Sequence, residues 1–199
     1  MPARQLVLAS ASPARLRLLR DAGFDPKVVV SGVDERDADP AEPGPLVELL
    51  ATRKASAVAE QLTGSDAVVV GCDSMLSLDA EVLGKPSTPA LARQRWQAMR
   101  GREGVLLTGH CVIDVATGRW AAGVAQTVVR FGTPTDDEID AYVATGEPLG
   151  VAGAFTLDGF AAPFVDGIDG DHGNVIGLSL PMMRRLLSEL DIEITSLWR

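Results

Sequence analysis

In the segment AVVVGCDS, residues 67–74, a continuous apolar run leads directly into an aspartate. A five-residue apolar run at 67–71 is typical of a central strand buried on both faces of a sheet. In α/β sheets, ligands gather at the carboxyl ends of such strands, where Asp73 would hold a metal or orient a water molecule. A turn aspartate that bonds to its own backbone is the alternative interpretation.

A second strand with a functional end is predicted near the N-terminus. Residues 6–9 read as a strand, and a helix follows over 13–21, with Ser12 as N-cap and a proline in the first helical position. Ser10, Ser12 and Arg15 then surround a helix N-terminus, whose N–H groups attract anions. The arrangement predicts either an anion cradle or an ordinary N-cap followed by a surface arginine.

Two lysines occupy unusual positions. Lys54 falls on the apolar stripe of a helix predicted over 45–61, four residues from Leu50 and from Val58. A lysine there is costly unless it is paired or reaches solvent. Lys85 lies in the tight loop LGKP at 83–86, which is no P-loop because Pro86 follows it and no upstream glycine is correctly placed. Singly, each lysine could also be a solvated side chain.

The remaining pattern predicts an α/β fold with a mixed sheet, because helical and strand periodicities alternate and long antiparallel pairs occupy the middle of the chain. Residues 34–45 are expected to form a loop and 146–177 a glycine-rich series of strands and turns. The other predicted elements are a strand at 28–30, a hairpin of 75–78 with 81–83, a helix that starts at Pro89, a strand pair at 105–115 and 120–129, and helices at 135–145 and 181–190.

Composition narrows the functional classes. The 199 residues suit one domain (1–199), and the net charge of −9, from 18 basic and 27 acidic residues, disfavours binding to nucleic acid. No signal-peptide core or membrane-length apolar run is present, so a cytoplasmic protein that does not bind membranes is expected.

The sequence gives little support for a zinc site, a calcium loop or a nucleophilic serine site. Two cysteines, Cys72 and Cys111, suggest no disulfide framework, and their spacing from the two histidines matches no zinc motif. The aspartates at 166–171 lack the order of a calcium loop. No Ser-His-Asp arrangement is visible. Phosphate-binding cations combined with carboxylates for a metal instead favour phosphoryl chemistry.

Nine motifs, in order over nearly the whole chain, resemble the Maf family of nucleotide pyrophosphatases. They are LASASPARLRLL (8–19), Asp34-Glu35, ATRKASAVA (51–59), VVVGCDS (68–74), LGKP (83–86), Thr108-Gly109, TGEP (145–148), AGAF (152–155) and IDGDHGNVIGLSLP (168–181).

The resemblance implies a two-lobed, mixed twisted sheet flanked by helices, similar to the inosine-triphosphate pyrophosphatase fold, with a nucleotide in a central cleft. It implies hydrolysis of a nucleoside triphosphate to the monophosphate and pyrophosphate, with Mg²⁺ or Mn²⁺ assisting water attack at the α-phosphorus. Asp73 would be the catalytic base and a metal ligand together with Glu35. Substrate would be bound by Ser10, Ser12, Arg15, Lys54 and Lys85. A homodimer is the family expectation.

Base preference is not fixed by the resemblance. Three positions associated with base choice, Ala14, Ser74 and Asp158, match neither the branch that acts on dTTP and UTP nor the 7-methyl-GTP branch. Pyrimidine nucleotides and modified nucleotides both stay open as substrates. A nucleotide-binding regulator of septum formation is the main alternative. A nucleotidyltransferase would need a glycine-rich loop after the first strand, where Ser10-Ala-Ser12-Pro13 stands instead.

Overall fold

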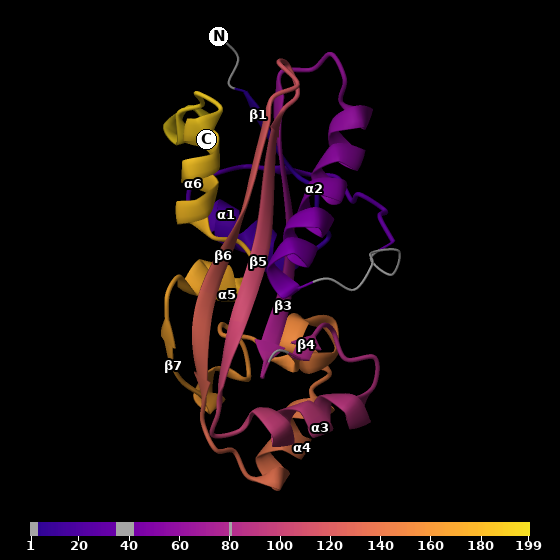
Figure 1. The fold of residues 1–199 in the computed structure, drawn as a ribbon, viewed down its shortest axis with the longest axis vertical. Helices are drawn as coiled ribbons and strands as arrows, with labels where there is room; N and C mark the ends of the chain where they lie inside the picture. The colour runs from indigo at the N-terminus through magenta and orange to yellow at the C-terminus, as the bar shows by residue number, and fades with distance from the viewer. Residues whose placement is uncertain (1–3, 35–41, 80) are drawn as a thin grey trace. The chain divides into compact units, whose positions relative to one another are not determined.

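A computed structural model describes residues 4–34, 42–79 and 81–199 (Figure 1). Within these residues the strands form one seven-stranded sheet in the order β2-β1-β3-β5-β6-β7, and β4 pairs with β3. The strand bounds are β1 (Gln5–Leu8), β2 (Lys27–Val28), β3 (Ala67–Leu78), β4 (Glu81–Leu83), β5 (Glu103–Asp114), β6 (Trp120–Phe131) and β7 (Val165–Asp169).

The sheet is mixed, as predicted. Strand β1 runs parallel to β2 and β3, whereas β4 and β7 run antiparallel to β3 and β6. The helices are α1 (Pro13–Asp21), α2 (Pro43–Gln61), α3 (Pro89–Met99), α4 (Asp136–Ala144), α5 (His172–Ile176) and α6 (Leu180–Glu189), with short 3₁₀ turns η2 (Glu147–Gly150), η3 (Ala152–Ala154), η4 (Ala162–Phe164) and η5 (Ile194–Leu197). The predicted α/β class is therefore confirmed.

Contacts divide the chain into two compact units. Unit 1 comprises Met1–Asp73, Thr108–Ala125 and Gly177–Arg199, and unit 2 comprises Ser74–Leu107 and Gln126–Ile176. The single-domain description with a central cleft stays a prediction.

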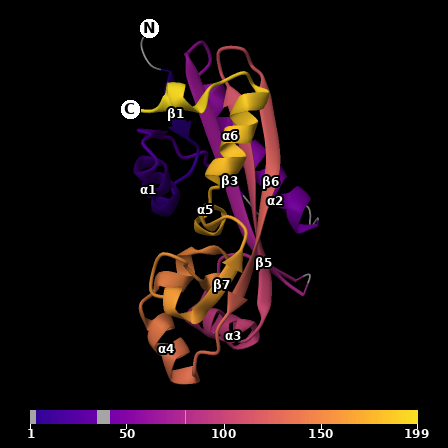
Figure 2. The ribbon, with the colours of Figure 1, turned by 90° about the vertical axis from the view of Figure 1, so that its left-hand side faces the viewer.

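In unit 1, helix α2 lies against one face of the sheet and helix α6 against the other. Alternate residues of the strands supply the α2 face, where Val7, Val69 and Cys111 pack against Ala51 and neighbouring helix residues. On the opposite face, a Cβ atom on Gly123 of β6 would meet the side chain of Met182 in α6. Figures 1 and 2 show α2 and α6 on either side of these strands.

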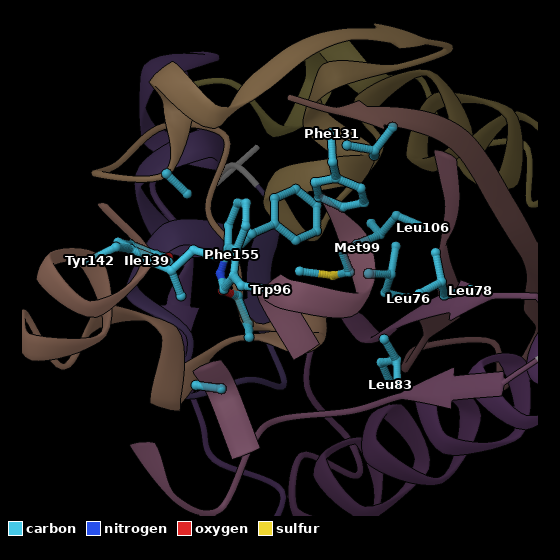
Figure 3. Packing of buried hydrophobic residues seen from close by; sticks show 14 of the residues in the cluster. Leu76, Leu78, Leu83, Trp96, Met99, Leu106, Phe131, Ile139, Tyr142 and Phe155 are labelled. Atoms are coloured by element: carbon cyan, nitrogen blue, oxygen red, sulfur yellow. The ribbon is translucent and has the colours of Figure 1, made fainter. Parts of the chain in front are cut away.

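In unit 2, the core is built around Trp96 of α3 (Figure 3). Its ring makes edge-to-face contacts with Phe131, Tyr142 and Phe164, at centroid distances of 5.6–5.8 Å. Such pairs stabilise the fold beyond the burial of their apolar surface. The indole Nε1–H donates to the Ala154 carbonyl at 2.8 Å, which satisfies the buried donor.

Most helix boundaries follow the capping signals in the sequence. The side chain of Ser12 caps α1 and that of Thr88 caps α3, each with proline in the first turn. Helix α4 starts with a complete capping box, in which Thr135 and Glu138 each accept a backbone N–H of the other. The predicted cap at Ser12 and the predicted starts of α1 and α3 are confirmed.

Three predictions about strands and turns were wrong. The apolar run 67–71 and the expected hairpin strand 75–78 are one continuous strand, β3, so Asp73 lies inside a strand rather than in a turn. Strand β2 covers Lys27–Val28, one residue earlier and shorter than expected. The segment after Asp169 contains the short helix α5, which glycine-rich sequence did not indicate.

Among the described residues, no helix is both long enough and apolar enough to span a membrane.

Candidate functional site

The centre of the candidate site is an ion pair between Lys54 of α2 and Asp73 of β3. Their Nζ and Oδ1 atoms are 2.6 Å apart, and the two residues are only 8% and 5% exposed. Removing two charges from water costs several kcal/mol for each ion unless they are paired. The pairing therefore explains how a lysine is accommodated on the apolar stripe of α2. Lys54 is not the solvated side chain that the sequence left as an alternative.

Two glycines bring helix α2 close enough to the sheet to form this pair. A Cβ atom on Gly71 of β3 would lie 2.4 Å from the Ala51 carbonyl oxygen and 2.8 Å from the Ala55 nitrogen. A Cβ atom on Gly109 of β5 would lie 2.1 Å from the Val47 carbonyl oxygen. The helix backbone thus rests directly on two strands. Since side chains on a strand alternate, Asp73 shares the face of Gly71 and meets Lys54, which directly precedes Ala55.

The register of the sheet places Asp73 just beyond the end of its parallel neighbour. Strand β1 pairs with β3 as far as Leu8 and Val70, and the Ala9 N–H donates to the Val70 carbonyl at 2.8 Å. Beyond that point the chain leaves the sheet and continues into helix α1. Although β3 continues, Asp73 therefore lies at the carboxyl end of the parallel part of the sheet, where α/β proteins place their ligand sites.

Arg15 is anchored beside this strand end by three acceptors from three segments. Its Nε–H donates to the Gly177 carbonyl at 2.7 Å, and its Nη1 donates to Ser10 Oγ and to the Cys72 carbonyl, both at 3.0 Å. The last acceptor belongs to the residue directly before Asp73. The alternative of a surface arginine is therefore excluded, since Arg15 links the loop after β1 to strand β3.

The hydroxyls of Ser10 and Ser12 organise the N-terminus of α1. Ser10 Oγ accepts the Ser12 N–H at 3.2 Å in addition to the Arg15 guanidinium, and Ser12 Oγ accepts the Arg15 N–H at 3.4 Å. A nine-residue helix thus begins among two hydroxyls and a guanidinium. Positive charge and N–H donors at a helix N-terminus form a favourable environment for a phosphate.

Because side chains alternate along a strand, the thiol of Cys72 lies on the opposite face of β3 from Asp73. Burial raises the pKa of Cys72 to about 11, and burial likewise raises the pKa of Cys111 to about 11. Both residues are free and completely buried. Both cysteines therefore pack as small apolar residues.

The described residues contain no cluster of three or more histidine, cysteine, aspartate or glutamate side chains suited to a metal ion. Of the two predicted metal ligands, Asp73 lies in the site described above, and Glu35 lies outside the described residues. Magnesium commonly uses one or two carboxylates together with substrate phosphates and water. As one buried carboxylate beside a predicted phosphate site, Asp73 fits such an ion as a single ligand.

The other predicted site residues fall in less constrained positions. Ala14 is partly exposed in the first turn of α1, and Ser74 follows Asp73 within β3. Lys85 and Asp158 belong to unit 2, where both are exposed, the first in the loop after β4 and the second in a bend after η3. Their roles stay predictions.

Sequence reasoning missed the residues that build the site without carrying charge. Gly71 and Gly109 determine the approach of α2, and the carbonyl of Gly177 orients Arg15. A glycine within an apolar strand is a usable signal for a close backbone approach, and Gly71 provides it. A backbone carbonyl acceptor distant in sequence leaves no such signal.

Comparison with known sequences identifies the family. A family profile described as Maf-like protein matches residues 5–190. The chain is 62% identical to a nucleoside triphosphate pyrophosphatase of Streptomyces avermitilis and 63% identical to one of Streptomyces coelicolor, each covering 99% of this chain and 96% of the relative. A third relative of the same name, from a Mycobacterium species, is 54% identical and covers 98% of each chain.

Among solved structures, a Staphylococcus aureus Ham1 protein aligns over 92% of this chain and 90% of its own, with a TM-score of 0.49 and 14% identity. The sequence match is the stronger result, because the profile spans almost all of the folded chain, from β1 to the end of α6. This chain belongs to the Maf family.

Proposed function

We propose that this protein is an enzyme that hydrolyses a nucleoside triphosphate to a nucleoside monophosphate and pyrophosphate. Relatives that are 51–63% identical bear the name nucleoside triphosphate pyrophosphatase. The observation that carries the proposal is the buried Lys54–Asp73 pair next to Arg15 and the N-terminus of α1. A carboxylate and phosphate-binding cations at one strand end are what water attack on a phosphoanhydride requires.

In the proposed reaction, Asp73 takes a proton from the attacking water as its oxygen bonds to the α-phosphorus. The bond between the α-phosphorus and the oxygen bridging to the β-phosphorus breaks, and that oxygen leaves with pyrophosphate. A carboxylate held by one ammonium keeps a fixed direction, as a general base must. Lys54 sets that direction through its 2.6 Å contact with Oδ1.

Arg15, Ser10 and Ser12 are proposed to bind the phosphate chain. The guanidinium is already oriented by Ser10, Cys72 and Gly177, so little side-chain freedom would be lost on binding. Fixed donors of this kind stabilise charge that develops in a transition state. Lys85 is proposed as an additional phosphate contact.

A divalent ion, Mg²⁺ or Mn²⁺, is proposed as cofactor because oxygen ligands favour these ions over softer metals. Asp73 would be one ligand and Glu35 a second. When bound, the ion would neutralise phosphate charge and polarise the attacked phosphorus.

The substrate is proposed to be dTTP, UTP or a modified nucleotide, with Ala14, Ser74 and Asp158 at the positions that select the base. A cytoplasmic homodimer, with a nucleotide in a central cleft of one domain, completes the proposal. The base-selecting positions, the cleft and the homodimer derive from the family resemblance stated above.

The proposal is tested by incubating the protein with a panel of standard and modified triphosphates, with Mg²⁺, with Mn²⁺ or with a chelator. In ¹⁸O-labelled water, attack at the α-phosphorus places the label in the monophosphate, whereas attack at the β-phosphorus places it in the pyrophosphate. Monophosphate carrying the label, formed only with metal, supports the proposal. Release of orthophosphate with a nucleoside diphosphate contradicts it. Binding of a nucleotide without turnover favours the regulator of septum formation.

A further inference from the structure

We infer that His110 is a positioning residue for Arg15, acting through the segment 177–179. His110 lies in β5 and is completely buried. Its Nε2 accepts the backbone N–H of Ser179 at 2.8 Å, and its Nδ1 lies 2.9 Å from the Thr108 carbonyl oxygen. A carbonyl can only accept, so Nδ1 carries the proton and Nε2 is the acceptor. The imidazole thus ties β5 to the residue that starts α6.

The segment held by His110 also holds Arg15. Gly177, two residues before Ser179, accepts the Arg15 Nε–H at 2.7 Å through its carbonyl. Gly177 has a φ of +122°, and a Cβ atom there would lie 3.1 Å from Arg15 Nε. The guanidinium therefore lies directly against the backbone of this segment. A shift of 177–179 would move an acceptor that orients Arg15.

Because Ser179 is buried, the hydrogen bond from its backbone N–H to His110 is important. Ser179 is 2% exposed, so its N–H cannot turn to water if the acceptor on His110 is lost. A buried N–H without an acceptor is unfavourable, and the backbone would move to find one. Ser179 Oγ separately caps α6 by accepting the Met182 N–H at 3.1 Å, and this second anchor does not involve His110. The helix can therefore persist while the 177–179 segment shifts.

The inference predicts that removing the Nε2 acceptor weakens phosphate binding without removing any group that touches phosphate. It rests on the proposed phosphate role of Arg15. It is tested with inorganic tripolyphosphate and Mg²⁺ in a calorimetric titration, which needs no turnover. Failure of the proposed hydrolysis would therefore leave this test intact.

Three substitutions at His110 separate its two hydrogen bonds. Gln places an amide oxygen near the position of Nε2 and can still accept from Ser179. Asn keeps a donor near Nδ1 but does not reach Ser179. Met fills the volume of the imidazole but offers only a weak sulfur acceptor. It replaces the Asn variant in the test if the Asn protein does not fold. Thermal unfolding of each variant identifies the folded proteins before binding is measured.

We expect His110→Asn and His110→Met to weaken tripolyphosphate binding by between about tenfold and a hundredfold, the cost of a small displacement of a positioned group. His110→Gln should bind within about threefold of wild type. In an Arg15→Ala background, His110→Asn should add no further loss, because its effect passes through Arg15.

Equal losses from His110→Asn with and without Arg15 would overturn the inference. Wild-type affinity in both the Asn and Met variants would overturn it as well. So would a wild-type protein that does not bind tripolyphosphate.

Discussion

Lys54 Nζ lies 2.6 Å from Asp73 Oδ1, and the pair lies where the backbone of helix α2 touches strand β3. Gly71 permits that contact because it has no side chain, and the contact determines how closely Lys54 approaches Asp73. Since a buried ion pair seldom stabilises a fold more than apolar residues of the same size would, stability alone does not explain this pair. The catalytic role proposed for Asp73 would account for the pair.

The first prediction concerns the energetics of the pair. Lys54→Met should lower the free energy of unfolding by about 3–5 kcal/mol, because the Asp73 carboxylate stays buried without its ammonium partner. The double variant Lys54→Met, Asp73→Leu should recover much of this loss, since no charge then remains. Urea unfolding of the two single variants and the double variant measures the coupling. Strictly additive losses would contradict a direct interaction.

The second prediction concerns Gly71. Gly71→Ala should displace α2, because the new methyl group would lie 2.4 Å from the Ala51 carbonyl oxygen. We expect the free energy of unfolding to fall by about 1–3 kcal/mol, and triphosphate hydrolysis to fall as Lys54 moves from Asp73. Gly150→Ala is the matched control, because nothing lies within 4 Å of its added methyl group. Equal stability and activity in the two variants would refute the proposed close approach.

The third prediction concerns pH. The pKa of Cys72 and that of Cys111 are raised by burial from 9.0 to about 11, so the folded state retains thiol protons that the unfolded state loses. Their contribution to stability is complete below pH 9 and is lost as pH rises toward 11. By pH 10, each thiol should lower the free energy of unfolding by on the order of 1 kcal/mol.

Urea unfolding at pH 7, 8.5 and 10 measures this dependence. The variant Cys72→Ala, Cys111→Ala provides the control, since every other titrating group is retained. Its free energy of unfolding should decline less steeply between pH 8.5 and 10 than that of wild type. Parallel curves for the two proteins would show that the thiols do not titrate as described.

Local signals in the sequence were sufficient for most elements. The caps at Ser12 and Thr88 and the capping box at Thr135 act over a few residues, and they mark the starts of helices that the sequence predicted. The position of Lys54 on an apolar stripe predicted either a paired or a solvent-reaching side chain, and the structure shows the pair with Asp73.

Information that depends on tertiary contacts could not be predicted in this way. The polar sequence Cys72-Asp73-Ser74 suggested that the apolar strand had ended, but pairing carries β3 through to Leu78. The anchoring of Arg15 by Gly177 joins residues 162 positions apart, and no local pattern encodes it. The partner of His110 is likewise 69 positions away.

The role of Asp73 as the base is tested by measuring pyrophosphate release by wild type and by Asp73→Asn, with the preferred triphosphate and metal. Asn keeps the size of Asp73 and a hydrogen-bond acceptor for Lys54 but cannot serve as a carboxylate base. We expect a folded variant whose kcat is at least about a hundredfold lower than that of wild type. A folded Asp73→Asn protein with wild-type kcat would contradict the assignment of Asp73 as the base.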